Sequence, residues 1–588
     1  VGSEMCIRDS YTDASIGDYF SVMWHGLPLD FSLAGYLTAI PGFLLIASAW
    51  TKSSILRRIR QGYFGIIAFV MSCIFIIDLG LYGFWGFRLD ATPIFYFFSS
   101  PKDAMASVSF WFILLGILAM LIYAAILYGI FYAVLIREKA PLKIPYQRQY
   151  VSLVLLLLTA ALFIPIRGGF SVSTMNLSKV YYSQNQRMNH AAINPAFSFM
   201  YSATHQNNFD KQYRFMDPKV ADELLTEMLD KPVAVTDSIP QILNTQRPNI
   251  IFIILESFST HLMETMGGQP NVAVNMDKFG KEGVLFTNFY ANSFRTDRGL
   301  ASIISGYPGQ PSTSIMKYPE KTDGLPSIPR SLKNAGYSLE YYYGGDADFT
   351  NMRSYLVSSG IEKIISETDF PLSERPGKWG APDHTLFQRF LKDLKEEKQQ
   401  EPFFKIVQTS SSHEPFEVPF YRLDDKVLNA FAYADSCVGD FVRQYKETPM
   451  WKNTLIVLVP DHLGAYPRPV ENPLEGHTIP LILIGGAVKE PRVVDTYASQ
   501  IDIAATLLSQ LGLPHDDFTF SKNIFNPSSP HFGYFTEPTL FGMVTAENQL
   551  VYNLDANTVQ IDEGTEKGAN LEKGKAFLQK LYDDLAKR

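Results

Sequence analysis

The sequence predicts a multispan α-helical membrane domain followed by an α/β domain with a mostly parallel central sheet. Long apolar runs fill the chain up to about residue 167, and a run of roughly 20 apolar residues is enough to cross a bilayer. From Pro248 onward, short apolar runs alternate with helix-like stretches, which is typical of a sheet covered by helices. Runs such as 250–255 lack polar alternation, which indicates strands buried on both faces.

Composition and charge narrow the class of protein further. A chain of 588 residues exceeds one ordinary core, so at least two domains are expected. The net charge of −8 argues against a nucleic-acid partner, and three cysteines offer no disulfide framework. Residues 1–30 begin with Val and contain no signal-peptide pattern, so we expect a truncated or artefactual N-terminus there.

Four stretches between residues 31 and 167 predict transmembrane helices. Their expected bounds are 31–50, 63–87, 107–136 and 150–167. The first and third connections each carry four basic residues against at most one acidic residue, whereas the middle one is balanced. The positive-inside rule therefore places the first and third connections in the cytoplasm. We expect a multi-pass protein of the cytoplasmic (inner) membrane, with everything after about residue 168 extracytoplasmic and a further span lost before residue 1.

Two features of this half need a separate interpretation. Asp78 lies inside the second predicted span, where a carboxylate is costly; it marks either a functional pocket or the approach to the membrane interface. Residues 168–247 are polar and contain turn-forming Asn-Pro and Asp-Pro pairs, so we expect an extracytoplasmic connector with a short helix at 218–229.

The α/β domain is expected to span 248–588. The clearest predicted strands are 250–255, 339–343, 403–408, 455–459 and 481–484. Helices are expected at 275–282, 299–305, 327–335, 350–359, 383–399, 426–446 and 499–511. After about residue 530 we expect antiparallel strands at 531–536, 542–545 and 550–554, followed by a closing helix at 569–586.

Ligand-type side chains follow two of the predicted strands. Glu256 comes directly after the first strand, and Asp461 and His462 come after the strand at 455–459. Ligands of such sheets gather at the carboxyl ends of the strands, so these three residues are expected to meet. Thr296 precedes a helix-like run, where the helix N-terminus favours an anion.

These four residues form a mixed oxygen and nitrogen set that suits Mn²⁺ or Zn²⁺, with Mg²⁺ possible. A bound dication would lower the pKa of the Thr296 hydroxyl and make it a nucleophile. Each residue also has an ordinary structural interpretation, Thr296 as a helix cap and Glu256 as a solvated loop residue; only their co-occurrence favours a site. His413 and His477 are further candidates for holding a phosphate oxygen, protonating a leaving alkoxide or binding a second metal.

At these residues the chain resembles a known family, the lipoteichoic acid synthase family of membrane phosphoglycerol transferases, within the alkaline phosphatase/sulfatase-like superfamily. The matching segments are 248–257, 286–299, 305–308, 410–415, 460–464 and 477–480. The multispan first half also fits. The resemblance implies an alkaline-phosphatase/sulfatase-like fold for the second domain, with a mostly parallel sheet.

The resemblance also implies roles for the residues. Glu256, Thr296, Asp461 and His462 would bind one divalent metal, most often Mn²⁺; Thr296 would be the nucleophile, and His413 would contact the substrate phosphate. The implied reaction moves phosphoglycerol from a phosphatidylglycerol-type lipid, through a phospho-threonine intermediate, to a glycan or polymer acceptor outside the cytoplasm.

One part of the family pattern is absent. The family's head-group pocket includes a Trp and an Arg after the strand near Tyr343, but this chain has Thr350 at the expected Trp position. Asp346 and Arg353 are the remaining candidates for glycerol contacts. His413 and His477 are the other candidate substrate-binding residues. The alternatives are a phosphoethanolamine transferase or phosphodiesterase of the same superfamily, or a non-catalytic membrane scaffold.

Overall fold

The computed structural model describes most of the chain and divides it into two compact units, Val1–Asn207 and Asn208–Arg588. The described residues are 15–51, 54–85, 87–89, 110–137, 147–183, 185–204, 208–235, 237–396, 399–467 and 472–588. Most of the predicted loops at 88–106 and 137–148, and the first 14 residues, lie outside them. The boundary between the units falls inside the predicted connector 168–247, so each unit takes one part of it.

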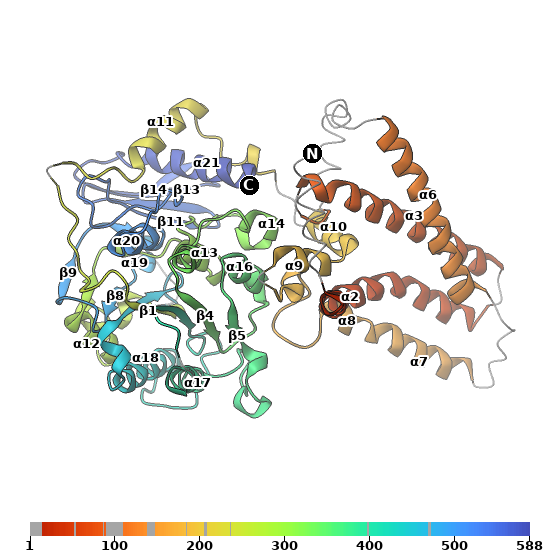
Figure 1. Ribbon diagram of the computed structural model, residues 1–588, viewed down its shortest axis with the longest axis horizontal. Helices are drawn as coiled ribbons and strands as arrows, with labels where there is room; N and C mark the ends of the chain where they lie inside the picture. Colours follow the sequence, from red (N-terminus) through yellow and green to blue (C-terminus); the bar gives the residue numbers. More distant parts are fainter. Residues whose placement is uncertain are drawn as a thin grey trace. The chain divides into compact units, whose positions relative to one another are not determined.

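Within its described residues, the first unit contains four helices that are long and apolar enough to cross a membrane, as the sequence predicts. The membrane-length segments are Ile16–Ser48, Ser54–Tyr82, Trp111–Ile136 and Arg148–Arg167. They comprise α2 (Ile16–Ser48), α3 (Ser54–Trp85), α6 (Phe110–Phe131) with the π-helix η1 (Tyr132–Ile136), and α7 (Arg148–Ala161) with α8 (Phe163–Arg167) (Figure 1). Shorter helices follow: η2 (Leu177–Val180), α9 (Gln186–Ala192) and α10 (Pro195–Thr204).

The first two spans begin earlier than predicted. Helix α2 begins at Ile16, not at residue 31, because Ser15 and Asp18 form a reciprocal capping box and Pro28 is accommodated within the helix. Helix α3 begins at Ser54 and takes in most of the basic connection, since Arg is a good helix former. Hydropathy finds the apolar centre of a helix, but it does not find polar turns that continue it.

Asp78 is buried and paired within the first unit. Its Oδ2 lies 2.6 Å from Nη1 of Arg88, and its Oδ1 accepts a hydrogen bond of 2.7 Å from the Leu89 N–H. Arg88 also donates to the His190 carbonyl through Nε, at 2.7 Å. The carboxylate thus joins the end of α3 to α9, which favours a structural role over a functional pocket.

The second unit is built on an eight-stranded, mostly parallel sheet of strand order β5-β4-β6-β1-β7-β8-β2-β9. All five predicted strands are present in it, and β8 is antiparallel to both its neighbours. The sequence did not predict the short strands β2, β5 and β9. The bounds are β1 (Asn249–Leu255), β2 (Val284–Phe286), β4 (Ser338–Tyr343), β5 (Lys363–Ile365), β6 (Phe403–Gln408), β7 (Thr454–Pro460), β8 (Leu481–Ile484) and β9 (Arg492–Val494).

Helices cover both faces of this sheet (Figure 1). Alternate residues of β1 pack on opposite sides: Ile251 and Ile253 join the core under α12, α17 and α18, whereas Ile250 and Phe252 join the core under α13, α15, α16 and α20. The helices of this unit are α11 (Pro218–Met228), α12 (Val274–Glu282), α13 (Thr296–Ser305), α14 (Pro319–Thr322), α15 (Ile328–Asn334), α16 (Met352–Ser358), α17 (Asp383–Glu396), α18 (Lys426–Tyr445), α19 (Pro473–His477), α20 (Ile503–Gln510) and α21 (Leu571–Lys587).

Two smaller sheets complete the unit. The pair β3 (Phe289–Tyr290) and β10 (Ala498–Ser499) is parallel. The C-terminal antiparallel sheet contains β11 (Gly533–Glu537), β12 (Leu540–Val544), β13 (Asn548–Asn553) and β14 (Thr558–Gly564). Three of these four strands were predicted; β14 was missed because it is largely exposed and its alternation is limited to Val559 and Ile561.

Candidate functional site

Three predicted ligands meet where β1 and β7 end. The two strands are parallel neighbours in register from Asn249 with Thr454 to Leu255 with Pro460, so their last residues are level. Glu256 and Asp461 are therefore side by side, and the Asp461 N–H donates to the Leu255 carbonyl at 3.1 Å. Parallel pairing thus brings together residues that are more than two hundred positions apart.

Glu256, Asp461 and His462 form the group of side chains that fits a metal ion. One potential ligand atom of each lies within 4.8 Å of the other two. His462 Nε2 is 3.5 Å from Glu256 Oε1 and 3.5 Å from Asp461 Oδ2. Asp461 is fully buried, and its Oδ2 has no hydrogen-bond partner among the described residues. A buried carboxylate oxygen without a donor is costly, and a cation at this point would satisfy it.

The backbone around His462 sets its ring in the form that a ligand needs. His462 Nδ1 lies 2.9 Å from the Leu463 carbonyl oxygen. A carbonyl only accepts, so Nδ1 carries the hydrogen and donates it, and Nε2 is left to face the two carboxylates. Metal-binding histidines commonly have this arrangement, with the second nitrogen held by a carbonyl or carboxylate.

The pKa values of Glu256, Asp461 and His462 show that two buried carboxylates share one positively charged neighbour. Burial, together with the negative charge of Glu256, raises the pKa of Asp461 to about 7. Burial also opposes ionisation of Glu256, but its hydrogen bond to His462 and the positive charge there lower its pKa to about 2. Against the effect of burial, both carboxylates raise the pKa of His462 to about 9. The cluster therefore attracts positive charge, which a divalent cation supplies.

Thr296 lies beside this cluster, at the first position of α13. Its hydroxyl favours the charged form of Asp461 and so lowers the pKa of that carboxyl, against the larger effect of burial. Two backbone contacts hold the helix there. The Leu463 N–H donates to the Ser293 carbonyl at 3.0 Å, and Gly299 packs so closely on Asp461 that a Cβ atom would lie 1.7 Å from the Asp461 carbonyl oxygen.

A supporting layer that the sequence analysis did not identify surrounds the ligands. The Ser257 N–H donates to Asp461 Oδ1 at 2.9 Å, and its hydroxyl donates to Glu256 Oε1 at 2.7 Å. Ser257 has a φ of 58°, an uncommon backbone conformation for a residue other than glycine. Thr409 Oγ1 accepts from the Glu256 N–H at 2.9 Å. The only sequence signal for Ser257 was its place next to Glu256.

His413 lies near the cluster, on the loop after β6. Its positive charge contributes to the lowered pKa of Glu256. Its Nδ1 is 3.1 Å from the Glu414 carbonyl oxygen, so this nitrogen carries a hydrogen and Nε2 is the exchangeable position. The ring packs against Trp379 at a tilt of 40°, with 3.7 Å between ring centroids. Trp379 was not a predicted site residue, because nothing in the sequence relates it to His413.

The other predicted contacts have partners of their own. His477 is fully buried; its Nδ1 is 2.8 Å from the Ala291 carbonyl, and its Nε2 is 3.2 Å from Glu537 Oε1. None of its described contacts is with the metal-type cluster, which consists of Glu256, Asp461 and His462, so its substrate role stays a prediction. Arg353 binds Asp348 through Nε at 2.7 Å, and Asp346 Oδ1 accepts from the Asp348 N–H at 2.9 Å. The roles of Asp346 and Arg353 also stay predictions.

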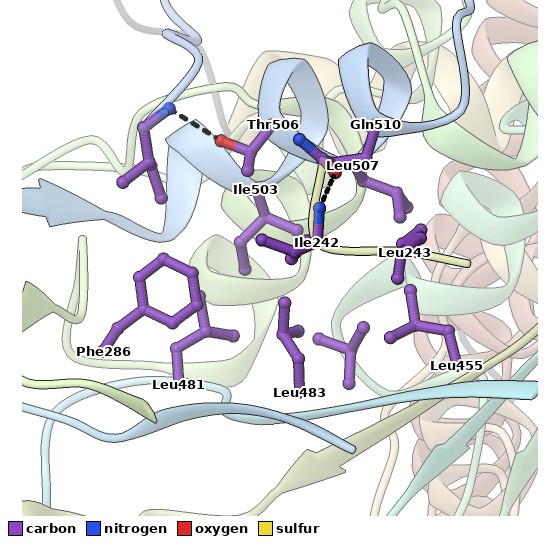
Figure 2. Close-up of a pocket in the computed structure, with 12 residues that line it drawn as sticks. Ile242, Leu243, Phe286, Leu455, Leu481, Leu483, Ile503, Thr506, Leu507 and Gln510 are labelled. Carbon is purple, nitrogen blue, oxygen red and sulfur yellow. Dashed lines mark hydrogen bonds between the residues drawn. The ribbon is translucent and has the colours of Figure 1, made fainter. Parts of the chain in front are cut away.

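A separate cavity lies in the apolar core between α20 and strands β2, β7 and β8 (Figure 2). Its two polar lining residues are already engaged: Gln510 Oε1 accepts from the Ile242 N–H at 2.9 Å, and Thr506 Oγ1 accepts from the Ile524 N–H at 3.0 Å. None of the predicted site residues lines it. This cavity is a gap in the packing and not a candidate active site.

Residues 248–513 match the Sulfatase family. The chain contains a sulfatase-like domain. A solved protein of the alkaline phosphatase superfamily from Vibrio parahaemolyticus has 26% identity and a TM-score of 0.56, covering 64% of this chain and 98% of its own. The lipoteichoic acid synthase LtaP from Listeria monocytogenes has the same fold, with 19% identity, a TM-score of 0.50, and coverage of 63% and 98%.

Curated relatives carry two related names. The lipoteichoic acid synthase-like protein YvgJ of Bacillus subtilis is 23% identical over 47% of this chain and 50% of its own length. The lipoteichoic acid synthase of Staphylococcus saprophyticus is 26% identical, with coverage of 46% and 46%. Phosphoglycerol transferase I of Xanthomonas campestris is 24% identical, with coverage of 50% and 45%. The chain spans about half the length of the curated relatives it matches.

Proposed function

We propose that this chain is a membrane phosphoglycerol transferase that uses Thr296 as its nucleophile and one divalent metal, Mn²⁺. The observation that carries the proposal is the meeting of Glu256, Asp461 and His462 beside the Thr296 hydroxyl at one end of the sheet. The names of the relatives, lipoteichoic acid synthase and phosphoglycerol transferase, support the same reaction class.

The residues fit the metal in chemistry and arrangement. Glu256, Asp461 and His462 would hold it with Thr296 as the fourth donor, a mixed oxygen and nitrogen set that suits Mn²⁺ and also accepts Zn²⁺ or Mg²⁺. When bound, a dication lowers the pKa of a hydroxyl ligand and neutralises charge on a phosphate. The helix N-terminus at Thr296 adds backbone N–H groups that favour the same anion.

The reaction takes place in two balanced steps. In the first, Thr296 Oγ1 forms a bond to the phosphorus of a phosphatidylglycerol-type lipid, the bond from phosphorus to the diacylglycerol oxygen breaks, and His413 Nε2 gives that oxygen a proton. In the second, an acceptor hydroxyl oxygen forms a bond to that phosphorus, the bond from phosphorus to Thr296 Oγ1 breaks, and His413 Nε2 takes the acceptor proton. Thr296 gives its hydroxyl proton to solvent before the first step, and its Oγ1 takes a proton from solvent after the second. His413 Nδ1 stays protonated throughout because it donates to the Glu414 carbonyl.

The membrane helices fit a lipid donor. Basic residues Arg57, Arg58 and Arg60 lie in the first two turns of α3, and Arg148 begins α7. By the positive-inside rule these ends are cytoplasmic, which puts the sulfatase-like domain on the outer side of the cytoplasmic membrane. Lipid head groups of the outer leaflet and a glycan or polymer acceptor would both be available there.

The test uses the full-length protein in detergent, labelled phosphatidylglycerol and Mn²⁺, with released diacylglycerol as the readout. We expect turnover that Thr296→Ala abolishes, while Thr287→Ala, a threonine whose hydroxyl is 3.3 Å from the Val494 carbonyl, leaves it unchanged. If phosphatidylethanolamine is turned over and phosphatidylglycerol is not, the proposed head group is wrong, and the proposed reaction at Thr296 stands. Absence of turnover with any phospholipid, in a protein that binds Mn²⁺, would overturn the proposal in favour of a scaffold.

A further inference from the structure

The indole of Trp379 and the imidazole of His413 share one backbone acceptor. Their ring centroids lie 3.7 Å apart, with 40° between the planes. Trp379 Nε1 donates to the Glu414 carbonyl oxygen at 2.8 Å, and His413 Nδ1 lies 3.1 Å from the same oxygen. The indole therefore limits rotation of the His413 ring in two ways, by covering one face of it and by holding the carbonyl to which it donates.

The turn that carries Trp379 is itself firmly placed. Gly377 and Gly380 form an isolated β-bridge, and Gly380 has a φ of 83°, which favours glycine. The Ala381 N–H donates to the Gly344 carbonyl at 2.9 Å, and a Cβ atom on Gly380 would lie 2.1 Å from the same oxygen. The turn is thus packed against the loop that follows β4, so Trp379 does not depend on His413 for its own position.

Other side chains complete the setting of the indole. The Phe349 ring meets it edge to face at 6.0 Å, and Lys378 Nζ lies 5.3 Å from its centre. Phe349 belongs to the same loop after β4 that carries Asp346 and leads to Arg353. The indole therefore connects the histidine to the loop where the sequence predicts head-group contacts.

We propose that Trp379 is a positioning residue that holds the His413 ring with Nε2 directed at the reacting phosphate. This inference rests on the proposed function, in which Nε2 exchanges the proton. His413 is half-buried on a loop, and its described ring contacts are with Trp379 and Glu414. Without the indole, the ring can turn about its side-chain bonds. Proton transfer requires a position within hydrogen-bond reach, and a misplacement of about 1 Å can cost about 100-fold in rate.

A double-mutant cycle in the full-length protein tests the coupling. Trp379→Ala should lower kcat by roughly 10- to 100-fold, with little change in Mn²⁺ affinity. Trp379→Phe should lower kcat by a smaller factor, because phenylalanine keeps an aromatic ring against His413 but loses the N–H donor. In a chain that already carries His413→Gln, Trp379→Ala should have almost no further effect. Equal losses in both backgrounds would overturn the proposal, because a merely structural role is additive.

Trp451 is the matched control. Its half-buried ring also lies beside a lysine, with Lys446 Nζ at 5.2 Å, and packs on Tyr445 with 6.2 Å between ring centroids. Trp451→Ala should leave kcat within about twofold, because none of its described contacts is with the cluster or with His413. A loss equal to that of Trp379→Ala would show that removing any such indole harms the fold, and would overturn the assigned role.

Tryptophan fluorescence separates this inference from the proposed function. We expect the Trp379 contribution to the emission, taken as wild type minus Trp379→Phe, to change in His413→Gln, because the indole loses the imidazole packed against it. This result would support the contact between the rings even if no phospholipid is turned over. A Trp379 contribution that is the same in His413→Gln as in the wild-type background would overturn the positioning role, whatever the substrate.

Discussion

The metal-type cluster and the region around Trp379 lie at the same end of the sheet but are built differently. Glu256 and Asp461 directly follow paired strands, and almost every polar contact around them is a backbone or buried hydrogen bond. Trp379 lies on a turn, Phe349 in a single 3-10 turn and Arg353 at the start of α16; all three are outside the strands and only half-buried. Under the proposed function, the residues of the chemistry are therefore fixed by the rigid sheet, whereas the predicted head-group contacts lie on segments outside it, which can change independently.

The largest effect is expected from removing a ligand. Asp461→Asn should lower turnover by at least about 1,000-fold and abolish Mn²⁺ binding, because the amide keeps the shape but not the charge. Turnover and metal binding by calorimetry measure this. Asp435→Asn is the control: Asp435 is also fully buried, and burial raises its pKa to about 6, but it caps α12 through the Asn275 and Met276 N–H groups. If both variants bind Mn²⁺ equally, the assignment of Asp461 is wrong.

Gly299→Ala should break the link between α13 and the cluster. A new Cβ atom would lie 1.7 Å from the Asp461 carbonyl oxygen, so the helix or the loop must move. We expect a loss of about 3 kcal/mol in unfolding free energy, measured by denaturant titration, together with loss of turnover. Gly280→Ala in α12 is the control, because its Cβ would meet only Leu285 at 3.4 Å, an ordinary contact. Equal stability of the two variants would contradict this packing.

The cluster also predicts how metal binding depends on pH. The pKa of His462 is raised from 6.5 to about 9, so the stability it contributes to the metal-free protein is present below pH 6.5 and is lost as pH rises through 9. The pKa of Asp461 is raised from 3.8 to about 7, so the metal-free protein also loses stability as pH rises from 3.8 to 7. Glu256, with its lowered pKa, loses its contribution only below about pH 4.5.

The difference in Tm between Mn²⁺-loaded and chelator-treated protein should therefore grow between pH 6.5 and 9. The bound metal neutralises the carboxylates in place of the protons that the metal-free cluster holds. It therefore maintains the stability of the folded protein at the higher pH values at which those protons are lost. Thermal unfolding in detergent across this range measures the difference. A difference that stays constant or shrinks with rising pH would contradict the charge balance described for the cluster.

The smallest effect belongs to the apolar cavity (Figure 2). Ile503→Val at its wall should cost about 1 kcal/mol in unfolding free energy and leave turnover and Mn²⁺ affinity unchanged, because it only enlarges a gap in the core. Denaturant titration and the lipid assay measure the two quantities. A change in turnover comparable to that of Gly299→Ala would show that this side of the sheet is coupled to the site.

Sequence reasoning succeeded where one local pattern determines the outcome. Unbroken apolar runs located the central strands, and parallel pairing then explains why Glu256 and Asp461 could be expected to meet. It was less successful where several weak contacts together determine the bounds of an element or the position of a side chain. The early start of α2 depends on a cap at Ser15, and the exposed strand β14 has only two alternating apolar residues, Val559 and Ile561. Trp379 reaches His413 only through the packing of a turn on Gly344, which no spacing in the sequence encodes.

The most direct test of the central claim is anomalous diffraction at the manganese edge from crystals of the protein grown with Mn²⁺. We predict one strong peak bounded by Glu256, Asp461 and His462, with Thr296 Oγ1 as a fourth ligand. A peak elsewhere, or one at the three residues with the Thr296 hydroxyl turned away and out of reach, would contradict the account.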